Sequence, residues 1–356
     1  MKKYSGKDKL IFVILLILNS LVGSSSLHSI EFPKDQSFHS EYDLEWVYIV
    51  GHYKLKNEQE VGMELSFFRA RSTNQKSKTS IEVFPVHFAI SDFTNKKHYS
   101  SQILGRKIGG LAFYDQNTIR VENFQIKMNQ DGSYDISARP KENSSIAVEL
   151  KVLTHLGNKL IHGDKGISRK SYLDPKFVSN YYSITRIPTL GKITLNGKSF
   201  QISENQVSWL DHEWSRAGLS DQDNSWDWVG FSLEDGSDWM AFRFRKDKVS
   251  ASEVFASKYE YSKIKTYDPT SDIIFQAQTN KTWKSPLTKK VYPMAWNLSS
   301  KSENLDLVIE PIFYEQEFDA RKSTGLAYWE GGVRVKGMRN GKPVNGKGYL
   351  ELKGYK

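Results

Sequence analysis

The chain has 356 residues, a formal net charge of +9, 13% aromatic residues and no cysteine. This length supports a large core and favours two domains over one. The absence of cysteine excludes disulfides, thiolate metal sites, a cysteine nucleophile and lipid attachment to an N-terminal cysteine. The basic residues are dispersed and accompany no nucleic-acid-binding motif, so we expect no nucleic-acid partner.

The N-terminus has the pattern of a secretory signal peptide over residues 1–26. Four lysines among the first nine residues precede an apolar run from Leu10 to Leu18, and small residues follow from Gly23 to Ser26. The run is too short for a confident membrane span, although an uncleaved anchor is the alternative. We therefore expect an exported protein, periplasmic or secreted.

The signal segment accounts for part of the positive charge. Its four lysines and Asp8 sum to +3, which leaves about +6 of the total +9 for the mature part. This excess favours peripheral contact with an anionic membrane surface, or it simply reflects a lysine-rich exterior in water.

From Glu41 onward, short runs of β-branched and aromatic residues alternate with turn dipeptides such as Asn196-Gly197 and Asn340-Gly341. This spacing is typical of antiparallel sandwiches and barrels. Helical periodicity of useful length is missing after the signal segment. The first predicted strands cover residues 44–55, 61–69, 80–90, 119–128, 134–138 and 147–153. The sequence therefore predicts an almost entirely β protein.

A weak internal repeat indicates two similar halves. Glu45-Trp46-Val47-Tyr48 leads through a turn to Phe67-Phe68-Arg69, and Trp226-Asp227-Trp228-Val229 leads through a turn to Phe242-Arg243-Phe244-Arg245. The linker is expected within Gly163 to Lys176, where Gly, Ser, Lys and Pro interrupt the apolar runs. We therefore divide the mature chain into an N-terminal domain, 27–170, and a C-terminal domain, 171–356.

Val207 to Ser215 (VSWLDHEWS) is the strongest candidate for a functional motif, since five of the nine tryptophans lie between Trp209 and Trp239. In a strand, alternation places Leu210, His212 and Trp214 on one face and Trp209, Asp211 and Glu213 on the other. An indole-rich pocket would lower the pKa of His212 and leave a neutral base or donor. The alternative is a core histidine whose hydrogen bonds are satisfied.

Asp211 and Glu213 need partners if they are buried, and Arg186 and Arg243 are the candidates. This set would form either part of a site or a buried ion-pair network that fixes the sheet. Trp226 and Trp228 share a face, opposite Asp227, and would line a cavity or fill a barrel. The eight histidines are scattered and no phosphate-binding glycine loop or Gly-x-Ser-x-Gly motif occurs, so we expect no metal and no cofactor.

The chain resembles the lipocalin-like family of carotenoid 1,2-hydratases (hydroxyneurosporene synthases) and AttH-type predicted secreted hydrolases. The resemblance covers nearly all of the mature chain. It is carried by ordered motifs: Glu45 to His52, His87 to Asp92, Tyr181 to Arg186, Trp209 to Ser215, Trp226 to Trp228, Tyr328 to Gly332 and Gly346 to Tyr355.

The resemblance implies two tandem lipocalin-like β-barrels. It also implies catalytic roles for the His and Trp of the Asp-His-Glu-Trp motif, here His212 and Trp214, with Asp211 and Glu213 beside them. A Tyr and an Asp implicated on a nearby strand of the hydratases have no counterpart in Met240 to Arg245. Hydration of an alkene needs a carboxylic acid with a raised pKa, so Asp211 or Asp227 would have to face the cavity.

Our hypothesis from the sequence is an exported protein that binds an elongated apolar ligand, an isoprenoid or acyl chain, in an aromatic pocket of the second barrel or at the junction. It would act as a cofactor-free hydratase or hydrolase. The alternatives are a non-catalytic lipid carrier and a structural envelope module. The expected ligand-binding residues are Trp226, Asp227, Trp228, Tyr182, Arg186, Arg243 and Trp329.

Overall fold

The computed structural model describes residues 28–73, 80–171, 177–216, 225–245 and 253–356, so the predicted signal peptide lies outside the described residues. Within these ranges the only helices are three 3₁₀ turns: η1 (Lys34–Gln36), η2 (Ile108–Gly110) and η3 (Thr154–Leu156). The all-β prediction is confirmed. No helix in the described ranges has the length and apolar character needed to cross a membrane.

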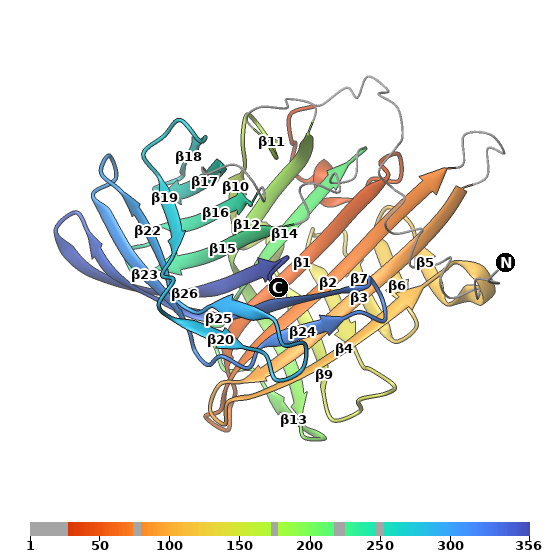
Figure 1. Cartoon of the computed structure of the whole chain (residues 1–356). Helices are drawn as coiled ribbons and strands as arrows, with labels where there is room; N and C mark the ends of the chain where they lie inside the picture. The colour runs from red at the N-terminus through yellow and green to blue at the C-terminus, as the bar shows by residue number, and fades with distance from the viewer. Residues whose placement is uncertain (1–27, 74–79, 172–176, 217–224, 246–252) are drawn as a thin grey trace, which may run out of the picture.

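The first sheet has fourteen antiparallel strands in the order β4-β3-β2-β1-β14-β12-β9-β8-β7-β6-β5, with β10, β11 and β13 also paired to β12. The red to green strands of Figure 1 form this sheet. The strands are β1 (Leu44–Lys54), β2 (Glu60–Thr73), β3 (Ser80–Asp92), β4 (Lys97–Gly105), β5 (Ala112–Tyr114), β6 (Thr118–Val121), β7 (Phe124–Met128), β8 (Tyr134–Ala138), β9 (Ala147–Val152), β10 (Asn158–Ile161), β11 (Ile167–Arg169), β12 (Val178–Leu195), β13 (Lys198–Gln201) and β14 (Val207–Ser215).

The second sheet has ten strands in the order β18-β17-β16-β15-β26-β25-β23-β22-β19, with β24 paired to β25, and β20 and β21 form a separate pair. Its blue strands lie beside the first sheet in Figure 1. The strands are β15 (Trp226–Leu233), β16 (Asp238–Phe244), β17 (Glu253–Glu260), β18 (Lys263–Tyr267), β19 (Ile274–Ala277), β20 (Thr282–Lys284), β21 (Val291–Pro293), β22 (Trp296–Ser300), β23 (Leu305–Pro311), β24 (Glu317–Ala320), β25 (Leu326–Arg339) and β26 (Lys342–Lys353).

Both sheets follow one plan, which explains the internal repeat. In each, the first strand pairs with the next strand and with the last one: β1 with β2 and β14, and β15 with β16 and β26. The change of sheet falls between Ser215 and Trp226, not near residue 170 as the sequence analysis placed it. β12 to β14 belong to the first sheet because β14 must pair with β1 to join its two halves.

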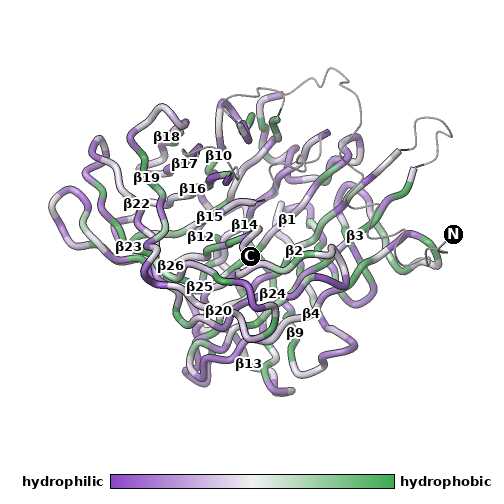
Figure 2. Tube along the Cα trace, in the orientation of Figure 1, coloured by the Kyte–Doolittle hydropathy of each residue, from purple (hydrophilic) through white to green (hydrophobic). Residues whose placement is uncertain are grey.

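Strand alternation gives each barrel its own core, and the alternating colours along the strands in Figure 2 follow it. The inward residues of β1, such as Val47 and Ile49, pack in the first barrel. Val229 and Phe231 of β15 pack in the second.

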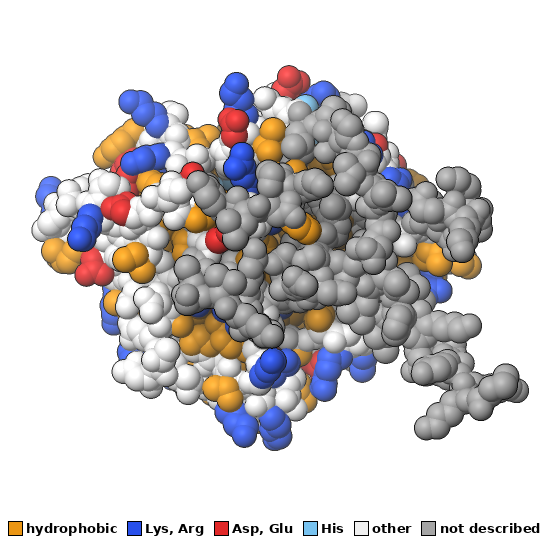
Figure 3. Space-filling model, turned by 45° about the horizontal axis from the view of Figure 1, so that its top comes forward, with side chains coloured by type: hydrophobic (Ala, Val, Ile, Leu, Met, Phe, Trp, Pro, Cys, Tyr) orange, Lys and Arg blue, Asp and Glu red, His pale blue; other side chains and the backbone are white. Residues whose placement is uncertain are grey.

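The outward faces of the two first strands are also buried, because the barrels pack against each other there. Tyr48 and Val50 of β1 form one cluster with Trp228 of β15 and Tyr349 of β26. The Tyr48 and Trp228 rings meet edge to face, with centroids 5.5 Å apart. We call this layer between the outer faces of the two sheets the junction. In contrast, Lys and Arg side chains stand out at the left, top and bottom edges of the face shown in Figure 3.

A buried ion-pair network closes the second barrel. Asp227, fully buried on the inward face of β15, accepts from Arg243 Nε at 2.8 Å and lies 3.1 Å from Arg245 Nε. The Tyr355 hydroxyl donates to its other oxygen at 2.9 Å. Asp227 thus ties three segments together, and removal of one partner from such a network leaves uncompensated buried charge.

We predict that Asp227→Ala lowers the free energy of unfolding by about 3 to 5 kcal/mol, because two arginines lose their buried counter-ion. Denaturant titration measures the change. Asp306→Ala, at an exposed position on β23, is the control and should change it by less than about 0.5 kcal/mol. Equal effects of the two substitutions would contradict the role assigned to Asp227.

Candidate functional site

The VSWLDHEWS motif forms β14, between β1 and β12. The predicted alternation is correct. Leu210 and Trp214 belong to the core of the first barrel, whereas Trp209 belongs to the junction. The two faces of the motif therefore lie in two separate environments, the core of the first barrel and the junction, on opposite sides of the sheet.

On the inward face, His212 is fully buried within a hydrogen-bonded chain of polar side chains. Its Nε2 lies 2.9 Å from Glu45 Oε1, and its Nδ1 lies 3.0 Å from the Tyr182 hydroxyl. Glu45 Oε1 also lies 2.9 Å from His39 Nδ1, and His39 Nε2 lies 3.4 Å from Asp35 Oδ1. The Trp214 indole stacks on His39 with ring centroids 3.7 Å apart.

The pKa shifts fit one arrangement of protons in this chain. Burial alone would lower the pKa of His39, but hydrogen bonds to Asp35 and Glu45 raise it. Burial would raise the pKa of Glu45, but hydrogen bonds from His212 and His39 lower it to about 2. Burial lowers the pKa of His212. A cationic His39 between two carboxylates, with a neutral His212 donating to Glu45 and accepting from Tyr182, satisfies every ring nitrogen.

The same residues have the donor types of a metal site. One ligand atom each of His39, Glu45 and His212 lies within 4.8 Å of the others, so these side chains could hold a divalent cation if the histidines released their shared protons. The proton arrangement above accounts for these contacts without an ion. The network thus has the properties of a structural tie inside the first barrel.

On the outward face, Asp211 and Glu213 have partners other than those expected. Asp211 accepts from the Tyr181 hydroxyl at 2.6 Å, Ser183 Oγ at 2.5 Å and Trp209 Nε1 at 2.6 Å. Glu213 pairs with Lys170 Nζ at 2.5 Å. The expectation that Arg186 and Arg243 neutralise these acids is wrong, since Arg243 pairs with Asp227 inside the second barrel.

Arg186 instead bridges the two barrels from an irregularity in β12. The pairing with β14 shifts register between Ile184 and Ile187, and Arg186 has a positive φ of 50°. Bulges of this kind redirect a side chain. Arg186 pairs with Asp238 at 2.8 Å and donates to the Leu233 carbonyl at 2.7 Å.

The structure thus distributes the predicted ligand-binding residues over three places. Tyr182 lies in the core of the first barrel. Trp329 lies in the core of the second, where Asp227 and Arg243 also pair. Trp226 and Trp228 lie at the junction. His212 and Trp214 are therefore separated from these two tryptophans by the wall of the first barrel, and one pocket cannot contain all of the predicted residues.

A cluster of buried acids at the junction emerges only from the structure. Glu64 of β2 and Glu330 of β25 come from different sheets and are almost fully buried. Among the described residues, both oxygens of Glu64 and Oε1 of Glu330 have no partner in good hydrogen-bond geometry, although the Tyr328 and Tyr48 hydroxyls interact with the two carboxyl groups. Glu351 of β26 is the cross-strand neighbour of Glu330 and of Trp228.

Burial raises the pKa of Glu64 to about 8, and the charge of Glu351 acts in the same direction. Burial, followed by the charges of Glu64 and Glu351, raises the pKa of Glu330 well above its usual value. Burial also raises the pKa of Glu351 to about 7 and lowers that of Lys353 to about 7. Because two adjacent acids cannot both ionise cheaply, Glu64 and Glu330 hold at least one proton at neutral pH.

Aromatic side chains enclose these acids. The hydroxyls of Tyr328 and Tyr48 lie beside Glu64 and Glu330, respectively. The Lys353 ammonium lies over the Trp226 ring, 3.7 Å from its centroid. No sequence pattern singles out these acids, although Glu330 and Glu351 lie inside two motifs of the family resemblance. An outward-facing Glu on a strand is indistinguishable from a solvated one until the packing of the sheets is known.

Phe93 packs against the strands that carry two of the acids, Glu64 and Glu330. Its ring occupies the space next to Gly62 and Gly332, where an added Cβ would clash with it. These glycines lie two residues from Glu64 and Glu330 on the same strand faces. On its other side, Phe93 meets Phe313 with ring centroids 6.4 Å apart.

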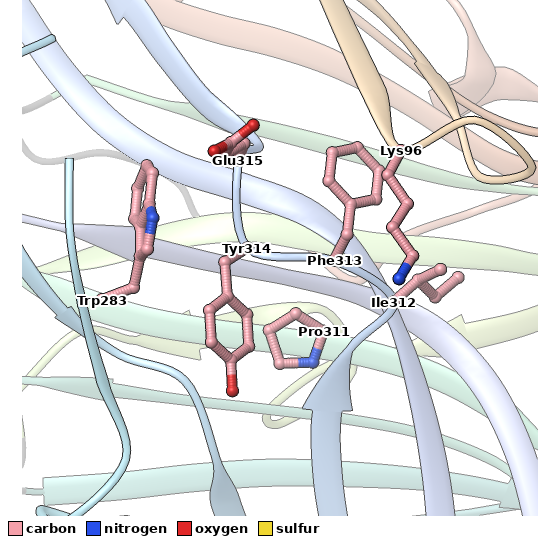
Figure 4. Close-up of a pocket in the computed structure, with 7 residues that line it drawn as sticks. All are labelled: Lys96, Trp283, Pro311, Ile312, Phe313, Tyr314 and Glu315. Atoms are coloured by element: carbon pink, nitrogen blue, oxygen red, sulfur yellow. The ribbon is translucent and has the colours of Figure 1, made fainter. Parts of the chain in front are cut away.

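Phe313 also lines an open surface groove of about 480 Å³, shown in Figure 4. Lys96, Phe313 and Ile312 lie on one side of the groove, and the Trp283 indole lies across from Tyr314. The lining residues are Lys96, Trp283, Pro311, Ile312, Phe313, Tyr314 and Glu315. A row of ring contacts therefore links this groove through Phe313 and Phe93 to Gly62 and Gly332, which lie two residues from the acids.

Comparison with known proteins agrees with this architecture. A crystal structure of an AttH protein from Nitrosomonas europaea matches with a TM-score of 0.81 and 27% identity, over 94% of this chain and 100% of that chain. Kievitone hydratase from Nectria haematococca has the same fold, with a TM-score of 0.71 and 14% identity over 94% and 95% of the two chains. CghA with Sch210972 matches at 0.51 and 12% identity, over 87% and 88%.

No curated protein matched the chain. The predicted architecture of two tandem lipocalin-like barrels is confirmed by the two sheets and by the match to the hydratase structure. The AttH-like family matches residues 24–355, which is nearly the whole sequence. The chain therefore belongs to the AttH-like family.

Proposed function

We propose that the junction binds an elongated apolar ligand and acts on it as a cofactor-free hydro-lyase, with the Glu64–Glu330 pair as the acid. The observation that carries this proposal is the burial of two carboxyl groups from different barrels with raised pKa values and, among the described residues, oxygens without a partner in good hydrogen-bond geometry. Evolution of a purely structural contact would favour apolar residues at such positions, because unpaired buried acids destabilise a fold.

The pair has the properties of a general acid and base that share a proton. A proton on one carboxyl group supplies the donor that the neighbouring oxygen lacks. Since the pKa of Glu64 is raised to about 8, this proton is retained at neutral pH and is available to a substrate. These are the conditions under which a carboxylic acid can protonate carbon.

Hydration would proceed in two steps. The protonated carboxyl transfers its proton to one carbon of a C=C bond, and the electron pair of the π bond forms the new C–H bond. Water then adds to the resulting carbocation, and its surplus proton returns to the carboxylate. The acid is regenerated and no cofactor is consumed. The reverse sequence removes water from an alcohol.

The surrounding rings suit a cationic intermediate. The faces of Trp228, Tyr48 and Phe242 lie in the junction cluster, and aromatic faces stabilise positive charge by electrostatic attraction. The same rings exclude water that would otherwise compete for the proton. An isoprenoid or acyl chain supplies the apolar surface that they contact.

The groove of Figure 4 would be the entrance. A ligand held against Trp283 and Tyr314 would reach the acids when the Phe93 ring leaves the space that it fills beside Gly62 and Gly332. His212 and Trp214, the catalytic residues implied by the family resemblance, would support this site from within the barrel wall by fixing β14. Export from the cytoplasm remains part of the proposal and is supported by the N-terminal sequence pattern.

The direct test is conversion of apolar molecules extracted from the membranes of the host, in isotopically labelled water. Mass spectrometry should detect products that have gained one labelled water, and Glu64→Gln and Glu330→Gln should each abolish the gain while the variants stay folded. A co-purifying ligand that is bound but never altered would overturn the hydro-lyase proposal in favour of a carrier. Activity that survives both substitutions would exclude the acid pair.

The acid pair also predicts a dependence of stability on pH. The unfolded chain releases the Glu64 proton near pH 4.5, whereas the folded protein holds it to about 8. Between these values the unfolded state binds fewer protons, so wild-type stability falls as pH rises. Glu64→Gln should remove this loss. Its free energy of unfolding, compared with that of wild type, should therefore increase with pH by up to about 1.4 kcal/mol per pH unit.

Denaturant titrations between about pH 5 and about pH 8 measure this gain. Glu204→Gln, in an exposed turn, is the matched control and should follow wild type. A constant difference between Glu64→Gln and wild type across this range would show that Glu64 is ionised in the folded protein.

We further predict that Phe93 controls access to the acids. Dicyclohexylcarbodiimide, an apolar reagent that adds to protonated carboxyl groups, should label Glu64 or Glu330, and labelling should fall as pH rises through about 8. Phe93→Ala should increase the labelling rate at least about tenfold by removing the blocking ring. Peptide mapping by mass spectrometry locates the adduct.

Phe113→Ala, which truncates an exposed ring on β5, is the control and should label at the wild-type rate. Unchanged labelling in Phe93→Ala would mean that the acids are reached by another route. Adducts confined to surface carboxylates would show that the junction acids carry no proton.

A further inference from the structure

The turn between β4 and β5 exposes apolar side chains that no other described element covers. Ile108 is 78% exposed, Leu111 51% and Phe113 44%. Gly109 and Gly110 have positive φ values of 69° and 72°, and an added Cβ at either would meet no atom within 4 Å. The turn, which includes η2, therefore projects from the body of the protein, as the gold coil at the edge of Figure 1 shows.

Cationic side chains border these apolar tips. Lys107 precedes Ile108, and its ammonium pairs with Glu82 at 2.6 Å, beneath the turn. Arg120 is the cross-strand neighbour of Phe113, with its guanidinium 5.8 Å from the ring centroid. In the described part of the chain, neither Arg120 nor Arg106 forms an ion pair, so both charges are available to an external anion.

We propose that this turn, residues 106–113 with Arg120, inserts into the surface of an anionic lipid bilayer. Apolar side chains enter the boundary between headgroups and acyl chains, and flanking arginines pair with anionic headgroups. This combination of apolar tip and cationic border is present on the turn, and the positive net charge of the chain acts in the same direction.

The shape of the turn favours a bilayer over a protein partner. A stable protein interface buries about 800 Å² on each partner and needs a broad complementary surface. Three side chains on a projecting turn offer a small convex area, which a fluid bilayer can surround. The proposal does not depend on the acid pair, and it would give the protein a direct route to apolar molecules held in membranes.

The absence of cysteine allows a site-specific test in the full chain. Ile108→Cys is labelled with an environment-sensitive dye and mixed with phosphatidylcholine vesicles that contain or lack phosphatidylglycerol. The dye emission should shift to shorter wavelength with the anionic vesicles. Leu287→Cys, at a residue that is 58% exposed on the β20–β21 turn, carries the control dye and should show no shift.

The charge contribution is measured in the labelled Ile108→Cys protein. Arg106→Gln with Arg120→Gln should raise the lipid concentration for half the shift roughly thirtyfold, from about 1 kcal/mol per basic residue. Salt should weaken the response of the labelled Ile108→Cys protein that keeps both arginines in the same way.

Three results would overturn the proposal. The first is a dye at position 108 that remains in water at low salt, and the second is an equal shift of the dyes at 108 and 287. A shift that depends on protein concentration without vesicles would assign the turn to a contact between two copies of the chain.

Discussion

The packing of two sheets by their outer faces determines the chemistry of this protein. A lipocalin-like barrel standing alone has one buried and one solvated face on each strand. Here β1, β2 and β14 are buried on both faces, because the second barrel covers the outer one. Side chains that would normally be solvated therefore lie in an apolar layer, and their pKa values and hydrogen bonds change accordingly.

This constraint accounts for the difference between the two polar clusters. The chain from Asp35 to Tyr182 inside the first barrel is complete, since each nitrogen and oxygen in it has a partner and the His39 cation lies between two carboxylates. The Glu64–Glu330 pair is incomplete, and within the described residues neither carboxyl group forms an ion pair. A complete network stabilises one conformation. An incomplete network leaves a proton and carboxyl oxygens free to interact with a substrate. We therefore place the proposed reaction at the Glu64–Glu330 pair.

The sequence predicts what depends on local pattern and misses what depends on sheet packing. Period-two alternation assigned His212 and Asp211 to opposite faces of β14, and turn dipeptides indicated the hairpins. Neither pattern says which strand of the first sheet closes on β1, so the boundary was placed before β12 and not after β14. Glu64 lies in a strand whose alternation resembles that of any half-solvated strand. Only the long-range contact with β25 identifies it, and that pairing leaves no local signal.

Each barrel is completed by its last strand, and this has a consequence for the order of assembly. Tyr349, Glu351 and Lys353 all belong to β26, which joins β15 to β25. During synthesis the first barrel can close once β14 has emerged, but the second must wait for β26. The outer face of the first barrel, with Glu64 and its aromatic neighbours, is then exposed throughout the time in which more than a hundred residues are added. The nascent protein thus exposes an apolar surface that becomes buried only after β26 has paired, and during that interval the chain is prone to aggregate.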